Sequence, residues 1–128
     1  MSKPETKLSK LELLVMQSFW ALGAATLREA HEAMPQNDKR PEYTTAQTIV
    51  TRLEAKGAIK RVKKVGNAWI YEPAISRKSV VGEMVDELFG LLEGAASPIV
   101  SHLAQSGKLS SDDIAEIEKI IEESKKKQ

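Results

Sequence analysis

A change of periodicity at Gly57 constrains the fold more than any other feature of the sequence. Before that residue, hydrophobic side chains recur at the spacing of one helix face. After it come a run rich in β-branched residues, a Gly-Asn turn at residues 66–67 and the strand-like sequence Trp69-Ile70-Tyr71. The sequence therefore predicts a group of helices followed by a single β-hairpin.

Three helices are predicted in the segment before Gly57. Each begins at a hydroxyl residue with Glu or Gln three positions later, which is the pattern of a capping box. The three pairs are Ser9 with Glu12, Thr26 with Glu29, and Thr44 with Gln47. Gly23 ends the first helix, Pro35 marks the exit from the second, and Gly57 occupies the C′ position of the third. We expect the third helix over residues 44–56.

Three helices and a hairpin, in that order, are typical of a winged helix-turn-helix. In this fold the third helix enters the major groove of DNA, and the hairpin, or wing, lies along the neighbouring backbone. The expected fold class is mostly α with a small β-hairpin. We expect a winged-helix DNA-binding domain at residues 1–75 and a helical dimerisation domain at residues 76–128.

The third helix combines an apolar stripe with short polar side chains on its flanks and outer face. Hydroxyls and amides can reach phosphates or base edges, Gln can pair bidentately with adenine, and a threonine methyl can pack against thymine. The candidate DNA-binding residues are Thr44, Thr45, Gln47, Thr48, Thr51 and Arg52 on the helix, and Lys63, Lys64 and Asn67 on the wing. The alternative is that the threonines only cap the helix and crowd its surface.

The charge distribution also favours a polyanionic partner. The net charge of the chain is only +1, but residues 1–75 carry 12 Lys and Arg against 8 Asp and Glu, and residues 76–128 carry 7 against 10. Residues 56–64 contain five basic residues and no acidic one. This local density suits a phosphate backbone. The alternative is a strand edge that lysines protect from unwanted pairing.

Residues 76–128 predict three further helices with apolar faces. The first begins at Ser76 or Ser79, and the last begins at Ser110 or Ser111. About fifty residues of helix bury too little surface to be stable alone, so we expect a homodimer. The candidate dimerisation residues are Val81, Met84, Val85, Leu88, Phe89, Leu92, Ile99, Leu103, Ile114, Ile117, Ile120 and Ile121. The alternative is that these helices fold back on their own winged domain.

The residues needed for most enzymatic and metal sites are missing from the sequence. The absence of cysteine excludes disulfides and thiolate metal sites and fits a reducing compartment. The two histidines, His31 and His102, lie far apart without further ligands nearby, and no nucleotide-binding or hydrolase motif occurs. We expect no enzymatic activity, no metal and no cofactor.

Two further expectations concern aromatic residues and location in the cell. Trp69 and Tyr71 share a strand face and are expected to pack in the core, with a stacking platform for single-stranded bases as the alternative. Residues 1–5 precede no apolar stretch, and Glu93 interrupts the most apolar later segment. We therefore expect neither a signal peptide nor a membrane span, and a cytoplasmic protein.

The segment Thr-Thr-Ala-Gln-Thr-Ile-Val-Thr-Arg-Leu-Glu-Ala-Lys-Gly at residues 44–57 resembles the recognition-helix signature of the penicillinase repressor family. Residues 11–20, 69–73 and 109–114 also resemble that family, so the resemblance covers nearly the whole chain. It implies a bacterial dimeric repressor that binds operators with TACA and TGTA half-sites, often beside resistance genes. It also implies base or phosphate contacts for Thr45, Thr48 and Arg52.

Family members of the β-lactam type are inactivated by a protease that cuts an Asn-Phe bond in the dimerisation region. The corresponding bond in this sequence is His102-Leu103, where neither residue matches, so a regulatory protease is an open hypothesis. The copper-sensing branch of the family uses a cysteine cluster that this chain lacks. A winged-helix protein-interaction adapter without DNA binding is the alternative function.

Overall fold

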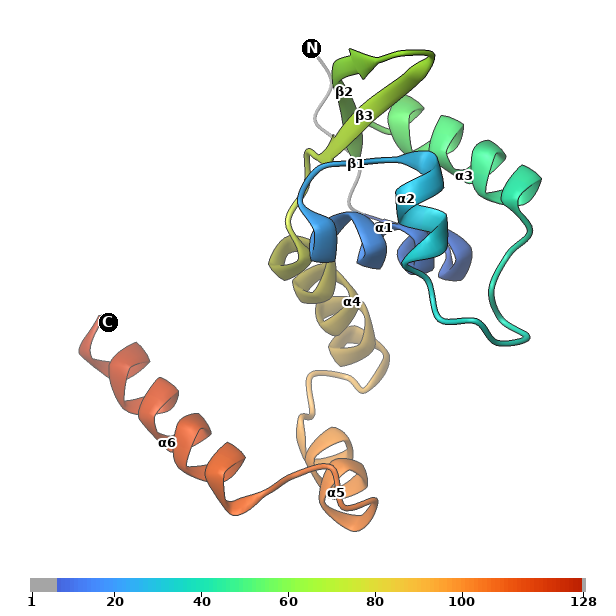
Figure 1. Ribbon diagram of the computed structural model, residues 1–128. Coiled ribbons are helices and arrows are strands. Elements are labelled where there is room, and N and C mark those ends of the chain that lie inside the picture. Colours follow the sequence, from blue (N-terminus) through green and yellow to red (C-terminus); the bar gives the residue numbers. More distant parts are fainter. Residues whose placement is uncertain (1–6, 128) are drawn as a thin grey trace. The chain divides into compact units, whose positions relative to one another are not determined.

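The computed structural model describes residues 7–127 of the chain. Residues 1–5, on which part of the expected absence of a signal peptide rests, lie outside the described residues. The elements are α1 (Lys10–Leu22), β1 (Ala25–Thr26), α2 (Leu27–Glu32), α3 (Tyr43–Ala55), β2 (Ile59–Val65), β3 (Ala68–Pro73), α4 (Arg77–Leu91), α5 (Ser97–Gln105) and α6 (Ser111–Lys126) (Figure 1). This is a winged helix-turn-helix followed by C-terminal helices, and the predicted fold class is confirmed.

Two predicted capping boxes start α1 and α2. The Ser9 hydroxyl accepts the Glu12 N–H at 3.2 Å, and the Glu12 carboxylate accepts the Ser9 N–H at 2.8 Å. Thr26 and Glu29 form the same pair of bonds at 3.2 and 2.9 Å. Each box satisfies two backbone N–H groups, one of them an otherwise unpaired donor of the first helical turn. Both helix starts were therefore correctly predicted from the sequence.

The predicted capping box at the start of α3 is wrong. The helix begins at Tyr43, Glu42 occupies the N-cap position, and no side chain caps the first turn. The ring of Tyr43 lies edge-on to the ring of His31, with centroids 5.5 Å apart, and the Arg28 guanidinium lies 5.1 Å from its centroid. These tertiary contacts favour a helix that starts at Tyr43, and they outweigh the capping pattern that begins at Thr44. The other end is as predicted, since Gly57 has φ +79°.

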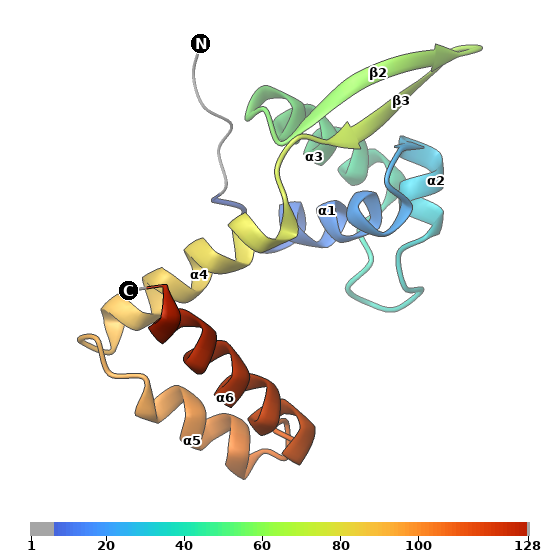
Figure 2. The same ribbon diagram turned by 90° about the vertical axis from the view of Figure 1, so that its left-hand side faces the viewer.

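The sheet has three strands in the order β1-β3-β2, all antiparallel. The β2–β3 hairpin projects away from α1, α2 and α3 (Figure 2). The sequence predicted this hairpin but not β1, whose two residues are too few to show an alternating pattern. Ala25 of β1 opposes Tyr71, and Thr26 opposes Ile70. The short strand thereby links the start of α2 to the base of the wing.

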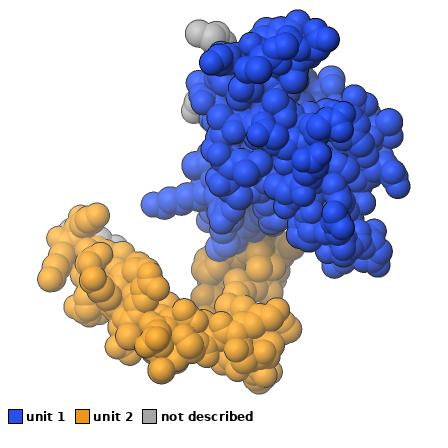
Figure 3. All heavy atoms as spheres, in the orientation of Figure 1, with its two compact units in different colours: residues 1–86 blue, residues 87–128 orange. Residues whose placement is uncertain are grey.

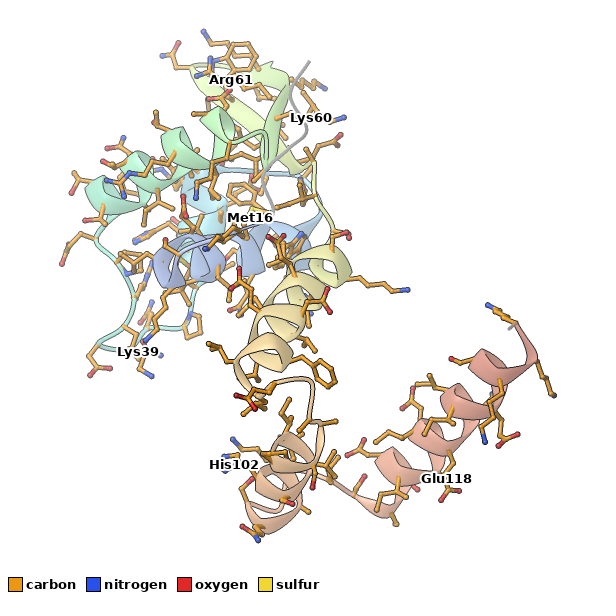
Figure 4. All side chains as sticks on the ribbon, turned by 180° about the vertical axis from the view of Figure 1, so that it is seen from behind. Met16, Lys39, Lys60, Arg61, His102 and Glu118 are labelled. Atoms are coloured by element: carbon orange, nitrogen blue, oxygen red, sulfur yellow. The ribbon has the colours of Figure 1, made fainter. Side chains whose placement is uncertain are left out.

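The hydrophobic core lies between α1, α3 and the sheet. Its largest fully buried side chains are Phe19, Met16, Ile49, Leu53, Ile59, Val15 and Val80. Burial of each large apolar side chain contributes about 1.5–3 kcal/mol. Met16 points into this interior from α1 (Figure 4). The core fixes one face of α3 and leaves its opposite face to solvent.

Serines precede the first and the last of the C-terminal helices, as predicted. The Ser76 hydroxyl accepts the Ser79 N–H at 3.0 Å ahead of α4, and Ser110 forms a capping box with Asp113 ahead of α6. The chain divides into two compact units, residues 1–86 and 87–128 (Figure 3). That division falls within α4, whose Val80 is buried with the core of the first unit. The functional boundary between residues 75 and 76 stays a prediction.

No helix within residues 7–127 combines the length and the apolar character needed to cross a lipid bilayer.

Candidate nucleic-acid interface

The third helix has one buried face and one exposed polar face. Ala46, Ile49, Val50 and Leu53 are buried. The six predicted DNA-binding residues of this helix, Thr44, Thr45, Gln47, Thr48, Thr51 and Arg52, are all exposed. Two of the hydroxyls already donate to the helix backbone, Thr48 to the Thr44 carbonyl at 3.4 Å and Thr51 to the Gln47 carbonyl at 3.0 Å. Their oxygens can still accept hydrogen bonds.

Several of these residues line one shallow depression beside α1. Its lining includes Thr44, Thr45, Thr48 and Arg52 of α3 together with Leu11, an exposed leucine near the start of α1. No acidic residue contributes to this lining. Hydroxyls, one guanidinium and two apolar side chains, Leu11 and Ile49, therefore share a surface that negatively charged DNA could approach without charge repulsion.

Three of the five basic residues in segment 56–64 are neutralised by acidic residues. Lys56 lies 2.7 Å from Glu12. Lys60 lies 3.3 Å from Glu72 on the neighbouring strand, and Arg61 lies 2.8 Å from Glu54. The high local charge read from the sequence therefore overstates what the segment offers to DNA. Among the described residues, no ion pair involves Lys63 or Lys64.

The ion pair of Glu12 with Lys56 is structural. Burial of the Glu12 carboxylate opposes ionisation, but hydrogen bonds from Lys56 and from the Ser9 backbone outweigh it, and the pKa of Glu12 is held below its ordinary value. The same carboxylate closes the capping box of α1. Lys56 therefore attaches the end of α3 to the start of α1, and its ammonium group is committed to that contact.

An irregularity in β2 places the two remaining lysines on opposite faces of the wing. Arg61 opposes Tyr71 and Lys63 opposes Ile70, so Val62 between them has no partner and forms a β-bulge. Cross-strand partners share a face, and Lys64 opposes Trp69.

We call one face of the hairpin the aromatic face; it carries Arg61, Lys64, Trp69 and Tyr71. The opposite face carries Lys60, Lys63, Ile70 and Glu72. Arg61 and Lys60 leave the hairpin on different sides (Figure 4).

The expectation that both wing aromatics are core residues is correct only for Tyr71. Tyr71 packs against the core and meets Phe19 edge-on at a centroid distance of 6.1 Å. Trp69 is half-buried and stands outside the core cluster. Arg61 and Lys64 lie 5.0 and 5.6 Å from its ring centroid. The hairpin has already left the helices at this point, so basic side chains cover the indole instead.

Two further residues of the candidate interface, Arg28 and Tyr43, were not predicted from the sequence. A second depression, of about 380 Å³, is lined by Arg28, Tyr43, Asn67 and Trp69, together with Thr26, Leu27, Ala68 and Tyr71. We call it the wing cleft. Arg28 had a detectable signal, since it occupies the first turn of a helix, where the helix dipole favours acidic residues. A basic residue at that place indicates a use other than helix stability.

The two histidines lie in different surroundings. His31 donates from Nε2 to the Pro41 carbonyl at 2.8 Å, and its Nδ1 accepts from Arg40 at 3.1 Å. It thus holds the loop between α2 and α3. His102 is exposed on α5 (Figure 4). No group of three His, Asp or Glu side chains in residues 7–127 could hold a metal ion.

The candidate dimerisation residues are largely exposed in the single chain. Nine of them are classed as exposed large hydrophobic residues, namely Val81, Met84, Val85, Leu88, Phe89, Ile114, Ile117, Ile120 and Ile121. Leu92, Ile99 and Leu103 are half-buried. The bond between His102 and Leu103 lies inside α5, where the His102 carbonyl accepts a hydrogen bond from the Ser106 hydroxyl at 2.7 Å. A protease would need this helix to unwind before it could bind the bond in an extended form.

A recognition helix with one fully exposed polar face, next to a projecting basic hairpin, defines a winged-helix DNA-binding protein. Comparison with known proteins gives the family. The family described as penicillinase repressor matches residues 8–123, and the chain belongs to that family. It is therefore a DNA-binding transcriptional repressor and not an enzyme. No curated protein matches the sequence.

Proposed function

We propose that the chain represses transcription as a cytoplasmic homodimer bound to a pseudo-palindromic operator in double-stranded DNA, in control of a resistance or stress operon. Helix α3 enters the major groove, and the wing, with Lys63, Lys64 and Asn67, lies on the phosphates. The observation that carries this proposal is the exposed face of α3, on which six polar side chains stand opposite a fully buried stripe.

The composition of that face supports base reading rather than charge attraction alone. Arg52 is its only charged side chain, and the others are threonines and Gln47. Threonine and glutamine give little non-specific affinity, but they form directional hydrogen bonds and methyl contacts at base edges. A surface built only for phosphate binding would need more lysine and arginine on this helix.

The exposed apolar side chains of α4, α5 and α6 support a homodimer. Within residues 7–127, neither α5 nor α6 buries a single side chain. A second copy of the same helices is a self-complementary cover for such a surface. Two-fold pairing would also set two recognition helices about 34–36 Å apart, or a multiple of it, as a palindromic site requires. Residues 76–128 thus serve dimerisation, and residues 1–75 serve DNA binding.

Release from the operator by a regulatory protease at His102-Leu103 is part of the proposal. Incubation with the protease of a β-lactam-type relative, followed by mass spectrometry, tests it. A cut at this bond with loss of the dimer supports the route. If the chain stays intact, release by this protease is excluded, and the inducing signal is of another kind.

Fluorescence anisotropy with two labelled duplexes tests the proposed function as a whole. One duplex contains the TACA and TGTA half-sites as a palindrome, and the other has the same bases shuffled. We expect tighter binding to the palindrome, with an affinity that falls steeply as salt rises. Equal affinity for both duplexes would show that the protein does not recognise this operator sequence. No binding to either duplex, at any salt concentration, would favour a protein-interaction adapter.

A further inference from the structure

One basic side chain without an acidic partner, Arg28, lines the wing cleft, and a second, Lys64, lies against the ring of Trp69, which lines it. Arg28 lies at one wall, with its guanidinium 5.1 Å from the Tyr43 ring centroid. Lys64 lies 5.6 Å from the Trp69 centroid, and Trp69 forms part of the other wall. Neither Arg28 nor Lys64 belongs to an ion pair among residues 7–127. Positive charge that the protein itself does not neutralise therefore stands in the cleft, on Arg28, and next to its Trp69 wall, on Lys64.

The aromatic rings hold both charges in place. A cation above an aromatic face is attracted by the ring quadrupole. The aliphatic stem of such a side chain packs on the ring while its head stays in water. Arg28 and Lys64 therefore lose less rotamer freedom on binding an anion than free surface side chains would. The cleft presents its charges in a fixed arrangement before any ligand arrives.

The position of the cleft matches the path of a DNA strand. Its walls come from the first residue of α3, the first turn of α2 and the strand that leaves the wing tip. With α3 in the major groove and the wing on the neighbouring backbone, as proposed above, a DNA strand would pass close to these elements. The amide of Asn67, at the wing tip, completes the lining with a neutral hydrogen-bonding group.

We propose that the wing cleft binds one sugar-phosphate strand of the operator, with Arg28 and Lys64 as phosphate contacts and Tyr43 and Trp69 as positioning residues. This inference rests on the proposed function and adds to it a second contact surface with its own residues. It also divides the two lysines of the wing. Neither lysine lines the cleft, but Lys64 shares a face of the hairpin with Trp69, which does, whereas Lys63 stands on the opposite face, across from Ile70.

The salt dependence of binding tests the inference. For each variant, the affinity for the palindromic duplex and for the shuffled duplex is measured over a range of salt concentrations. We expect Arg28→Ala and Lys64→Ala each to reduce the slope of log affinity against log salt by about 0.9. Phosphate contacts do not depend on sequence, so the reduction should appear with both duplexes. Lys39→Ala is the control, because Lys39 is an exposed lysine on the loop between α2 and α3, away from the hairpin (Figure 4).

Two further variants separate charge from folding. Arg28→Lys keeps the charge and should keep the slope, and Lys63→Ala should lower the slope less than Lys64→Ala does. Wild-type slopes in both Arg28→Ala and Lys64→Ala would overturn the inference, as would an equal loss in Lys39→Ala. The proposed function fails separately, if the wild-type protein does not distinguish the palindromic from the shuffled duplex.

Discussion

At the scale of single residues, the proposed function distinguishes side chains of the exposed face of α3 that read bases from those that bind phosphate. Gln47 and Thr48 carry no charge and stand on that face. Replacing either with alanine should change the preferred operator sequence, at a cost of about 1–3 kcal/mol for each affected base pair, with little change in the salt slope. Selection from a randomised half-site, followed by sequencing, measures this preference.

Gln17→Ala is the matched control for Gln47→Ala. Gln17 is an exposed glutamine on α1, outside α3 and the wing. The selected half-site should be identical to that of the wild type. If Gln47→Ala and Thr48→Ala also select the wild-type half-site, then other side chains read the bases.

The pair of Glu12 and Lys56 makes stability depend on pH. The pKa of Glu12 is lowered in the folded protein, because the hydrogen bonds from Lys56 and Ser9 outweigh the effect of burial. A carboxyl group with a lowered pKa stabilises the fold fully above its ordinary value of 4.5, and this contribution is lost as the pH falls below 4.5 through the folded-state pKa. Glu12→Gln should lower the free energy of unfolding at neutral pH by about 2 kcal/mol. It should also flatten the decline of stability in acid.

Urea denaturation at a series of pH values from neutral down to pH 3 measures both effects. The lowest pH of the series is about one to two units below an ordinary carboxyl pKa. Glu29→Gln is the control, because Glu29 forms the same kind of capping box without a lysine partner. It should change the acid dependence less. A Glu12→Gln variant whose stability falls in acid as steeply as that of the wild type would contradict the prediction.

The sequence allowed us to predict which residues are exposed, but not which residues form ion pairs. Helical periodicity places Ile49 and Leu53 inward, and therefore Thr48 and Arg52 outward, without knowledge of the rest of the fold. The partner of Lys56, by contrast, is Glu12, which lies 44 positions away. Contacts at such separations depend on the tertiary arrangement, which local patterns do not encode.

At the scale of elements, α3 has an N-terminus without a side-chain cap. Glu42 occupies the N-cap position with extended dihedrals of φ −61° and ψ 156°, but its side chain makes no capping bond. Glu42→Asp keeps the charge on a side chain short enough to cap, and should raise the free energy of unfolding by about 0.5–2 kcal/mol. Thermal unfolding followed by circular dichroism measures the gain. Glu42→Gln, which adds no cap, should give none, and a Glu42→Asp variant no more stable than Glu42→Gln would be evidence against the cap.

The two features of the wing, its turn and its bulge, differ in how well the sequence predicts them. Turn chemistry at Gly66-Asn67 predicted the hairpin correctly, because a two-residue turn has strict backbone requirements. The bulge at Val62 has no comparable requirement, so it was not predicted. Without it, strict alternation would place Lys63 with Arg61 on one face of β2. Which wing lysine shares a face with Trp69 therefore had to come from the structure.

At the scale of the whole molecule, the proposed function depends on two copies acting together. Each winged domain presents one recognition helix, and a palindrome has two half-sites. Simultaneous binding converts the second contact into an intramolecular one, which raises the overall affinity without new contacts. The apolar residues of α4, α5 and α6 were predictable from periodicity. How they pair is not encoded in any one segment of sequence.

Leu88 offers a direct test of that dependence. It is 43% exposed on α4, among the apolar side chains that a second copy would cover. Leu88→Asp places a charge in the proposed interface, and we expect a monomer at micromolar concentration by sedimentation equilibrium. Leu88→Met conserves volume and apolar character and should stay dimeric.

Operator binding should follow the oligomeric state. Leu88→Asp should lose most of its affinity for the palindromic duplex but keep that of the wild-type protein for a duplex with one half-site, because its winged domain is unchanged. Circular dichroism should show the same helix content in both variants. If Leu88→Asp sediments as a dimer, α4 does not form the interface. If the wild-type protein is itself a monomer at micromolar concentration and binds the palindrome no better than the half-site, operator recognition does not depend on pairing at all.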